Sequence, residues 1–304
     1  MPFPPSPSPS PSPRSGPPGS GPDLLAERLS ALDARLSELG SVLVAFSGGA
    51  DSALLLAAAV RALGAEHVGA ATAVSDSLAG GEEQAAQAFA QSLGVRWFAP
   101  TTHEMQREGY RANAGDRCFH CKAELLDTLA PLAAEQGLAH VATGTNADDA
   151  LAGFRPGIRA AAERGAVTPL LDAGLTKDDV RAASRAWGLP TWDKPAAACL
   201  SSRVAYGVVI TAPHLARVDR AEREVRSALG RAGVASTDVR VRDLGQDTAR
   251  IELDADAVAG LDEVTAATLL RSVRAVGFRE VLLDPRGFRS GSMNELLPSP
   301  ELFR

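Results

Sequence analysis

Short, wholly apolar runs alternate with longer segments of helical periodicity through the first two thirds of the chain. An apolar run this short, with no polar face, is typical of a strand that is buried on both sides. The runs are residues 42–46, 68–74, 95–98 and 140–143, and the helical segments are residues 23–39, 53–63, 82–93 and 122–136. This alternation predicts an α/β fold, in which a parallel sheet carries helices on both faces.

The pattern changes after about residue 206. The periodicity then predicts two helices and a hairpin around Gly245, followed by one last strand. The helices are expected at residues 213–229 and 261–276, and the strands at 239–242, 249–253 and 281–283. We therefore expect one domain at residues 23–205 and a smaller C-terminal α+β domain at residues 206–304.

The first 22 residues hold 10 of the 20 prolines of the chain, mixed with serine and glycine. A segment of this composition cannot bury enough apolar surface to offset the entropy of ordering it. Residues 1–22 are therefore predicted to be a disordered tail. They also lack the apolar stretch of a signal peptide.

Charge and cysteine content exclude several classes of protein. The chain has 37 acidic and 31 basic residues, and a net charge of -6 argues against a protein that coats nucleic acid. No apolar run approaches the roughly 20 residues that span a bilayer. The cysteine count of 3 is too low for a secreted disulfide scaffold. We expect a cytoplasmic protein with reduced thiols, with neither a nucleic-acid partner nor a membrane.

A glycine-rich turn follows the first predicted strand and leads into a helix. At Gly48 and Gly49 the backbone N–H groups can approach a phosphate, and the helix N-terminus adds positive potential. Ser47 and Ser52 can donate hydrogen bonds, and Asp51 is a candidate Mg²⁺ ligand or helix cap. A plain strand-to-helix turn is the alternative, and no Walker A Gly-Lys-Ser/Thr sequence occurs. The position after the first buried strand favours a phosphate-binding loop.

Two later segments also favour nucleotide chemistry. Gly144 follows the fourth predicted strand and would let the backbone approach a ribose or phosphate, while Asp148 and Asp149 could hold Mg²⁺ or cap the next helix. Thr176 is a good N-cap, which puts Lys177 in the first turn of a helix. A cation there opposes the helix dipole unless an anion such as pyrophosphate lies nearby. A solvated lysine and an Asx-rich turn are the alternatives.

The three cysteines are Cys118, Cys121 and Cys199. The first two form a Cys-x-x-Cys pair that encloses His120. Three interpretations compete: inert buried thiols, a structural Zn²⁺ site that uses His120, and an iron–sulfur cluster held by three thiolates. Three ligands on a four-iron cluster would leave one iron open to carry sulfur.

Several motifs carry a resemblance to known enzymes. The turn at 47–52 resembles the PP-loop of the N-type ATP pyrophosphatases, which have an adenine nucleotide alpha hydrolase-like fold and cleave ATP between the α and β phosphates. Four further segments are Lys194–Pro195, Cys199–Arg203, the pair 239–242 with 249–252, and 287–294. Together they make residues 23–295 similar to the LarE sulfur transferases.

This resemblance implies a reaction. The substrate would be pyridinium-3,5-biscarboxylic acid mononucleotide, and the product would be the bisthiocarboxylic acid ligand of the nickel-pincer cofactor used by lactate racemase. ATP and Mg²⁺ would adenylate each carboxylate at the turn 47–52, with Lys177 neutralising the polyphosphate. Sulfur would then displace AMP.

The resemblance also implies two possible sulfur sources. In one kind of LarE a cysteine at the position of Cys199 gives up its own sulfur. In the other kind three cysteines hold a [4Fe-4S] cluster that supplies it. With Cys118, Cys121 and Cys199 all present, the chain resembles the cluster type, and Zn²⁺ is the less favoured occupant.

Four arginines are candidate ligands for the thiolate and the anions. Arg203 is a candidate cation beside the thiolate. Arg240 and Arg242 stand two apart on a predicted strand and so share a face that suits a phosphate, although an ordinary exposed strand face is the alternative. Arg289 with Ser290 and Ser292 is a second oxyanion candidate, with a solvated C-terminal loop as the alternative.

The chain leaves other possibilities open. Glu222 and Glu224 are expected on a solvated helix face. Another PP-loop enzyme, such as a tRNA thiolase or an amidating synthetase, is the rival enzyme, and a regulatory iron–sulfur or ATP sensor is the rival without catalysis. The resemblance also implies a homo-oligomer whose C-terminal domain serves substrate binding or oligomerisation.

Overall fold

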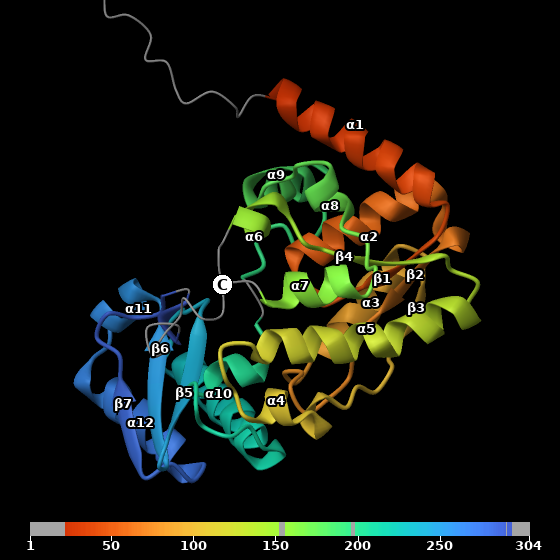
Figure 1. Cartoon of the computed structure of the whole chain (residues 1–304). Coiled ribbons are helices and arrows are strands. Elements are labelled where there is room, and N and C mark those ends of the chain that lie inside the picture. The colour runs from red at the N-terminus through yellow and green to blue at the C-terminus, as the bar shows by residue number, and fades with distance from the viewer. Residues whose placement is uncertain (1–21, 152–155, 196–197, 290, 294–304) are drawn as a thin grey trace, which may run out of the picture.

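The structure is a computed structural model that describes residues 22–151, 156–195, 198–289 and 291–293 (Figure 1). The predicted tail lies outside the described residues except for Pro22, which begins helix α1 (Pro22–Leu39). The elements fall into two lobes, each built around its own sheet.

The first lobe contains a four-stranded sheet in the order β3-β2-β1-β4. Its strands are β1 (Val42–Ala45), β2 (Val68–Ala71), β3 (Arg96–Phe98) and β4 (His140–Thr143). Every neighbouring pair is parallel. The predicted α/β fold is therefore confirmed. The chain order leaves β1 in the middle, with β2 on one side and β4 on the other.

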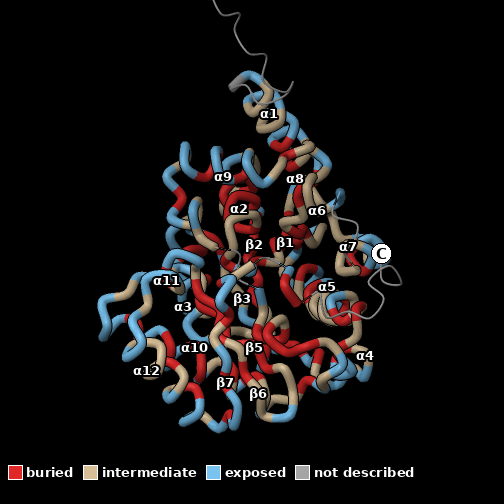
Figure 2. The backbone as a smooth tube through the Cα atoms, turned by 90° about the vertical axis from the view of Figure 1, so that its left-hand side faces the viewer, coloured by how far each residue is buried: buried red, intermediate tan, exposed pale blue. Residues whose placement is uncertain are grey.

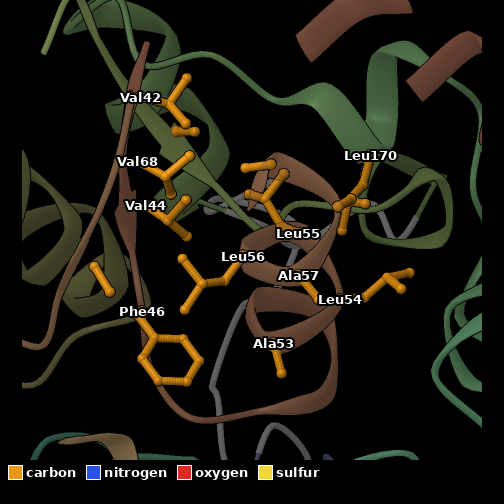
Figure 3. Close-up of a cluster of buried hydrophobic side chains, with 14 of the residues drawn as sticks. Val42, Val44, Phe46, Ala53, Leu54, Leu55, Leu56, Ala57, Val68 and Leu170 are labelled. Atoms are coloured by element: carbon orange, nitrogen blue, oxygen red, sulfur yellow. The ribbon is translucent and has the colours of Figure 1, made fainter. Parts of the chain in front are cut away.

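Side chains of β1 alternate between two cores, one on each face of the sheet. Val42 and Val44 pack with helix α2 (Ala50–Leu63) (Figure 3). Leu43 packs with Leu129 on helix α5 (Arg117–Glu135). Helices α1, α3 (Glu82–Ser92) and α9 (Lys177–Ala186) join α2 on the first face. Because strands alternate their side chains, wholly apolar strands need helices on both faces.

Helix α2 is the centre of the first lobe. Residues 52–59 are all buried, because the helix is apolar almost all round and packs between β1 and the outer helices (Figure 2). Its apolar surface holds the N-terminal end of the helix firmly against the end of β1. Even so, no helix among the described residues is both long and apolar enough to cross a membrane.

The second lobe contains a three-stranded sheet, with β5 (Val239–Gly245) antiparallel to β6 (Thr248–Leu253) and β7 (Glu280–Leu283) parallel to β6. Helices α10 (Ala212–Ala232) and α12 (Glu263–Ala275) cover it, and α11 (Ala255–Ala259) follows β6. Tyr110 from α4 (Glu108–Arg111) and Leu200 from the short helix η3 (Leu200–Arg203) also enter this core. The small α+β part is thus present, joined to the first lobe by buried side chains.

Two boundaries differ from the sequence prediction in ways that matter for the site. Helix α5 begins at Arg117, before the predicted start at Lys122, so the Cys-x-x-Cys pair is helical. Strand β2 ends at Ala71, and beyond it Val74 forms only an isolated bridge with Thr101. The short helices α6 (Ala147–Leu151), α7 (Pro156–Glu163) and α8 (Pro169–Asp172) were also not predicted.

The start of α9 depends on Asp179. Its carboxylate accepts hydrogen bonds from the N–H and hydroxyl of Thr176, at 2.9 and 2.7 Å, and pairs with Arg28 of α1 at 2.5 Å. Burial opposes its ionisation, but these partners outweigh burial and lower the pKa of Asp179. Thr176 caps the helix as predicted.

We expect Asp179→Ala to destabilise the protein by about 1–2 kcal/mol, because it removes a capping box and an ion pair between two helices. Thermal unfolding followed by circular dichroism checks this. Since the folded-state pKa is lowered, the difference between variant and wild type should shrink as the pH falls through that pKa. The exposed neighbour Asp178→Ala is the control, and an equal loss in both variants would contradict the assignment.

Candidate active site

The glycine-rich turn lies at the point where the strand order of the first sheet reverses. Parallel sheets bind ligands at the carboxyl ends of the two strands on either side of such a point. The turn 47–52 leaves β1, and the loop 144–149 leaves its neighbour β4. The two candidate loops are therefore brought together, although 95 residues separate Asp51 from Asn146.

The glycine-rich turn has a left-handed backbone at Gly48 and leads directly into the N-terminus of α2. Gly48 has φ 71°, a left-handed conformation that favours glycine, and Gly49 is the N-cap of α2. The hydroxyl of Ser52 donates to the carbonyl of Gly49 at 3.1 Å and lies 3.2 Å from the hydroxyl of Ser47. Both hydroxyls are thus held at the helix N-terminus, where the dipole favours an anion.

Gly144 lies directly against this turn. A Cβ atom at Gly144 would stand 2.9 Å from the backbone nitrogen of Ser52 and 3.1 Å from the carbonyl carbon of Asp51. Backbone atoms cannot move aside as the end of a flexible side chain can. The sequence therefore needs glycine here so that the two loops can touch.

Asp51, Asp149 and Lys177 form a charged cluster beside the turn. Asn146 donates to Asp51 at 3.0 Å, and Lys177 pairs with Asp149 at 3.2 Å. Burial raises the pKa of Asp51, and the charge of Asp149 adds to this, while Asn146 and Lys177 oppose it. Asp148 faces elsewhere, accepting the backbone N–H of Lys177 at 2.8 Å at the start of α9.

The buried side chain of Asn146 was not singled out by sequence reasoning. It is fully buried, and its carbonyl oxygen also accepts from the backbone N–H of Asp149 at 3.0 Å. It therefore fixes two of the candidate acidic residues relative to each other. Its position inside the motif 144–149 was the available signal.

The cysteines gather at one cleft of about 690 Å³, which also contains the glycine-rich turn. Cys121 and Cys199 line the cleft, and Cys118 lies on α5 one turn before Cys121 and is exposed. Burial raises the pKa of the Cys121 thiol, and the charges of Cys199, Glu104 and Cys118 add to this. Cys118 and Cys199 therefore both lie within electrostatic reach of Cys121.

Among the residues that the structure describes, no group of three or more His, Cys, Asp or Glu side chains is arranged to hold a metal ion. His120, the fourth ligand considered for Zn²⁺, packs against Gly109 and lies 3.4 Å from Asp116. Because His120 and Cys118 are two residues apart on α5, their side chains point to nearly opposite sides of the helix.

All three lysines of the chain lie at this cleft. Lys122 and Lys194 line it, and Lys177 pairs with Asp149 on its wall. Burial lowers the pKa of Lys122, while the charges of Cys121, Cys118 and Asp149 oppose this. These are the only three lysines among 31 basic residues. Their rarity was the available sequence signal for a functional role, although only Lys177 was predicted to be a site residue.

An ion pair lies directly against the glycine-rich turn. Lys194 meets Glu82 at 2.7 Å, and a Cβ atom at Gly48 would lie 3.6 Å from the Glu82 carboxylate and 3.7 Å from the Lys194 nitrogen. The Lys194 ammonium group is therefore held next to the glycine-rich turn. Its present partner is a carboxylate, the kind of group that a phosphate could replace.

Arg203 forms hydrogen bonds to the backbone beside Cys199. It pairs with Glu222 at 2.9 Å and donates to the carbonyls of Ala198 and Cys199, the latter at 3.1 Å. Glu222 is buried and also accepts from the backbone of Val241 at 3.1 Å. The prediction that Glu222 is solvated is therefore wrong, because Arg203 compensates its charge. Glu224 is exposed as expected.

The two arginines of β5 have different surroundings. Both are buried, but only Arg240 lines the cleft, where it pairs with Asp238 at 3.2 Å and stacks on Phe288. Burial lowers the pKa of Arg240, and the neighbouring positive charges of Arg203 and Arg242 add to this. Arg242 pairs with Glu252 at 2.8 Å outside the cleft lining.

Arg223 and Arg226 of α10 also line the cleft beside Arg240, and sequence reasoning missed both. They stand three apart on one helix face, which is the spacing that could have revealed them. Arg289 is not among the lining residues and lies 3.6 Å from Asp284, while its proposed companion Ser290 lies outside the described residues. Arg223, Arg226 and Arg240 thus form an arginine wall of the cleft, on elements of the second lobe.

Two known proteins resemble this chain over nearly its whole length, whereas no protein-family model matches it. An uncharacterised protein of Synechocystis is 43% identical over 275 residues, which is 90% of this chain and 99% of that protein. The pyridinium-3,5-bisthiocarboxylic acid mononucleotide synthase of Lactiplantibacillus plantarum is 36% identical over 278 residues, 91% of this chain and 98% of that enzyme.

We expect Gly144→Ala to destabilise the protein by about 1–3 kcal/mol, because the new Cβ would be forced against the backbone of the glycine-rich turn. Thermal unfolding measures the loss. Gly230→Ala is the matched control, since Gly230 lies inside α10 with no atom within 4 Å of its Cβ position. That variant should be neutral or more stable. A Gly144→Ala protein as stable as wild type would contradict the close approach of the two loops.

Proposed function

This chain belongs to the LarE family of pyridinium-3,5-bisthiocarboxylic acid mononucleotide synthases, and we propose that it uses ATP to replace carboxylate oxygen with sulfur on a pyridinium mononucleotide. The single observation that carries the proposal is the composition of the cleft. One cavity brings together a glycine-rich turn, two thiols and an arginine wall. An acyl-activating and sulfur-transferring enzyme needs all three beside each other.

The nucleotide would bind at the glycine-rich turn. Asp51 and Asp149 support Mg²⁺ there, because Mg²⁺ is usually held by one or two carboxylates together with substrate phosphates. Lys177 and Lys194 supply positive charge for the polyphosphate. A substrate carboxylate oxygen would attack the α-phosphorus of ATP, forming the acyl adenylate and releasing pyrophosphate.

The mononucleotide would bind with its phosphate toward the arginines. Arg240, Arg223 and Arg226 line that part of the cleft, and guanidinium groups suit phosphate oxygens. Such a position leaves the ring toward Cys199 and Cys121. Sulfur would attack the activated acyl carbon and AMP would leave, and a second round would convert the other carboxylate.

For the sulfur source we propose a [4Fe-4S] cluster held by Cys118, Cys121 and Cys199. The charges of both Cys118 and Cys199 act on the Cys121 thiol, which supports a site that all three thiolates share. Bound with three thiolates, the cluster would leave one iron open to carry the sulfur to be transferred. The free thiols also support a reducing, cytoplasmic setting. Sacrifice of the Cys199 sulfur itself is the alternative.

We expect AMP and pyrophosphate to form only when the pyridinium biscarboxylate mononucleotide is present, since activation needs its carboxylate. Asp51→Asn should lower that rate by about 100-fold or more, because it removes a charged ligand of Mg²⁺. Asp178→Asn, an exposed aspartate on α9, should leave it unchanged. Release of ADP, or substrate-independent hydrolysis, would overturn the proposed reaction.

We expect the protein purified without oxygen to contain about four iron and four sulfide per chain. Replacing any one of Cys118, Cys121 and Cys199 by Ser should lower both together. His120→Ala is the control within the pair, and it should keep the iron because its ring faces Gly109. Absence of iron after anaerobic reconstitution would leave Cys199 as the sacrificial donor.

A further inference from the structure

Glu104 is a buried carboxylate on the wall of the cleft. It is only 2% exposed and lies at the start of η2 (Glu104–Gln106), which follows β3. Its Oε1 atom accepts hydrogen bonds from the hydroxyls of Ser77 at 2.7 Å and Ser75 at 2.5 Å. A side chain fixed in this way cannot swing out into solvent.

Glu104 lies at the thiol end of the cleft. The backbone carbonyl of Ser77 accepts the N–H of Leu200 at 2.9 Å, and Leu200 directly follows Cys199. The charge of Glu104 also helps to raise the pKa of Cys121. Glu104 therefore lines the same cleft as Cys121 and Cys199, and its hydrogen-bond partner Ser77 contacts the residue that follows Cys199.

Cationic partners distinguish Glu104 from the other acidic side chains of the cleft. Each of four others forms an ion pair: Glu82 with Lys194, Asp149 with Lys177, Asp219 with Arg223, and Glu222 with Arg203. Asp51 is influenced by Lys177. Within the described part of the chain, Glu104 has no cationic side chain within ion-pair distance.

A buried carboxylate without a cation is costly, and a cationic ligand would compensate it. We propose that Glu104 recognises the positively charged ring of the pyridinium substrate and so selects cationic rings over neutral rings of similar shape. The inference rests on the proposed function, because it assumes that the substrate ring lies at the thiols.

The reaction requires the ring to come close to Glu104. Sulfur must approach the acyl carbon to about 3–3.5 Å before it can react, and that carbon is attached directly to the ring. Whether the sulfur is carried by Cys199 or by a cluster on the three thiolates, the ring must therefore enter the thiol end of the cleft, whose lining includes Glu104. The arginine wall then attracts the substrate phosphate, and Glu104 the ring charge.

Nicotinate mononucleotide and its reduced 1,4-dihydropyridine form test this directly. They differ by a hydride, and only the oxidised ring is positively charged. Dissociation constants can be measured by calorimetry on the full chain, without ATP. We expect wild type to bind the pyridinium form about tenfold tighter or more, as pairing of a buried charge implies.

Glu104→Gln should reduce this preference to about threefold or less, while Glu104→Asp, which keeps the charge, should retain most of it. Glu108→Gln is the matched control, because Glu108 is exposed on α4 and does not line the cleft. Circular dichroism checks that each variant is folded. The wild-type preference itself needs no variant to fold.

Equal binding of the two rings by wild type would overturn the inference and leave the proposed function standing. A Glu104→Gln variant that keeps the full preference for the pyridinium form would also overturn the inference and leave the proposed function standing. If that variant keeps the preference but alters the pH profile of sulfur transfer, Glu104 is a proton acceptor instead. Failure of wild type to bind either mononucleotide would overturn the proposed substrate class, and the inference with it.

Discussion

The buried ion pair between Arg203 and Glu222 holds the candidate site together. Arg203 also donates to the carbonyl of Cys199, and Glu222 of α10 accepts from the backbone of Val241 in β5. Removing one partner of such a pair leaves an uncompensated buried charge, which is strongly destabilising. The pair therefore fixes the cysteine segment to both a helix and a strand of the second lobe, and the cleft exists only where these lobes meet.

Different elements bring different charges to this cleft. The glycine-rich turn and the residues around it contribute a helix N-terminus, acidic side chains and lysines, whereas α10 and β5 contribute arginines. Lysine is a compact charge that suits a metal-bound polyphosphate, whereas the planar fork of arginine suits a phosphate ester held in a fixed orientation. The chain has no lysine apart from these three, so their presence here is a property of the site.

The sequence was informative wherever a signal is local. Apolar runs located β1 and its neighbours, and the glycine-rich turn lies where that pattern required, at the end of β1. The start of α5 was missed because Cys118 and its neighbours are weak helix formers, although tertiary packing makes them helical. Burial of Glu222 could not be predicted, since its compensating partner is Arg203, 19 positions earlier in a different element.

Residues 194–203 connect the two halves of the proposed reaction. Lys194 lies against Gly48 of the glycine-rich turn, Cys199 lines the cleft, and Arg203 pairs with Glu222 of α10. Lys194 and Arg203, which lie on either side of Cys199 in the sequence, each form an ion pair, with Glu82 and Glu222 respectively. In the proposed reaction, an acyl adenylate formed at the glycine-rich turn would meet its sulfur donor within the same cleft. It would not have to pass through bulk water, where the adenylate would be hydrolysed. The short distance in sequence between Lys194 and Cys199 is thus a physical reason for activation and sulfur transfer to share one cavity.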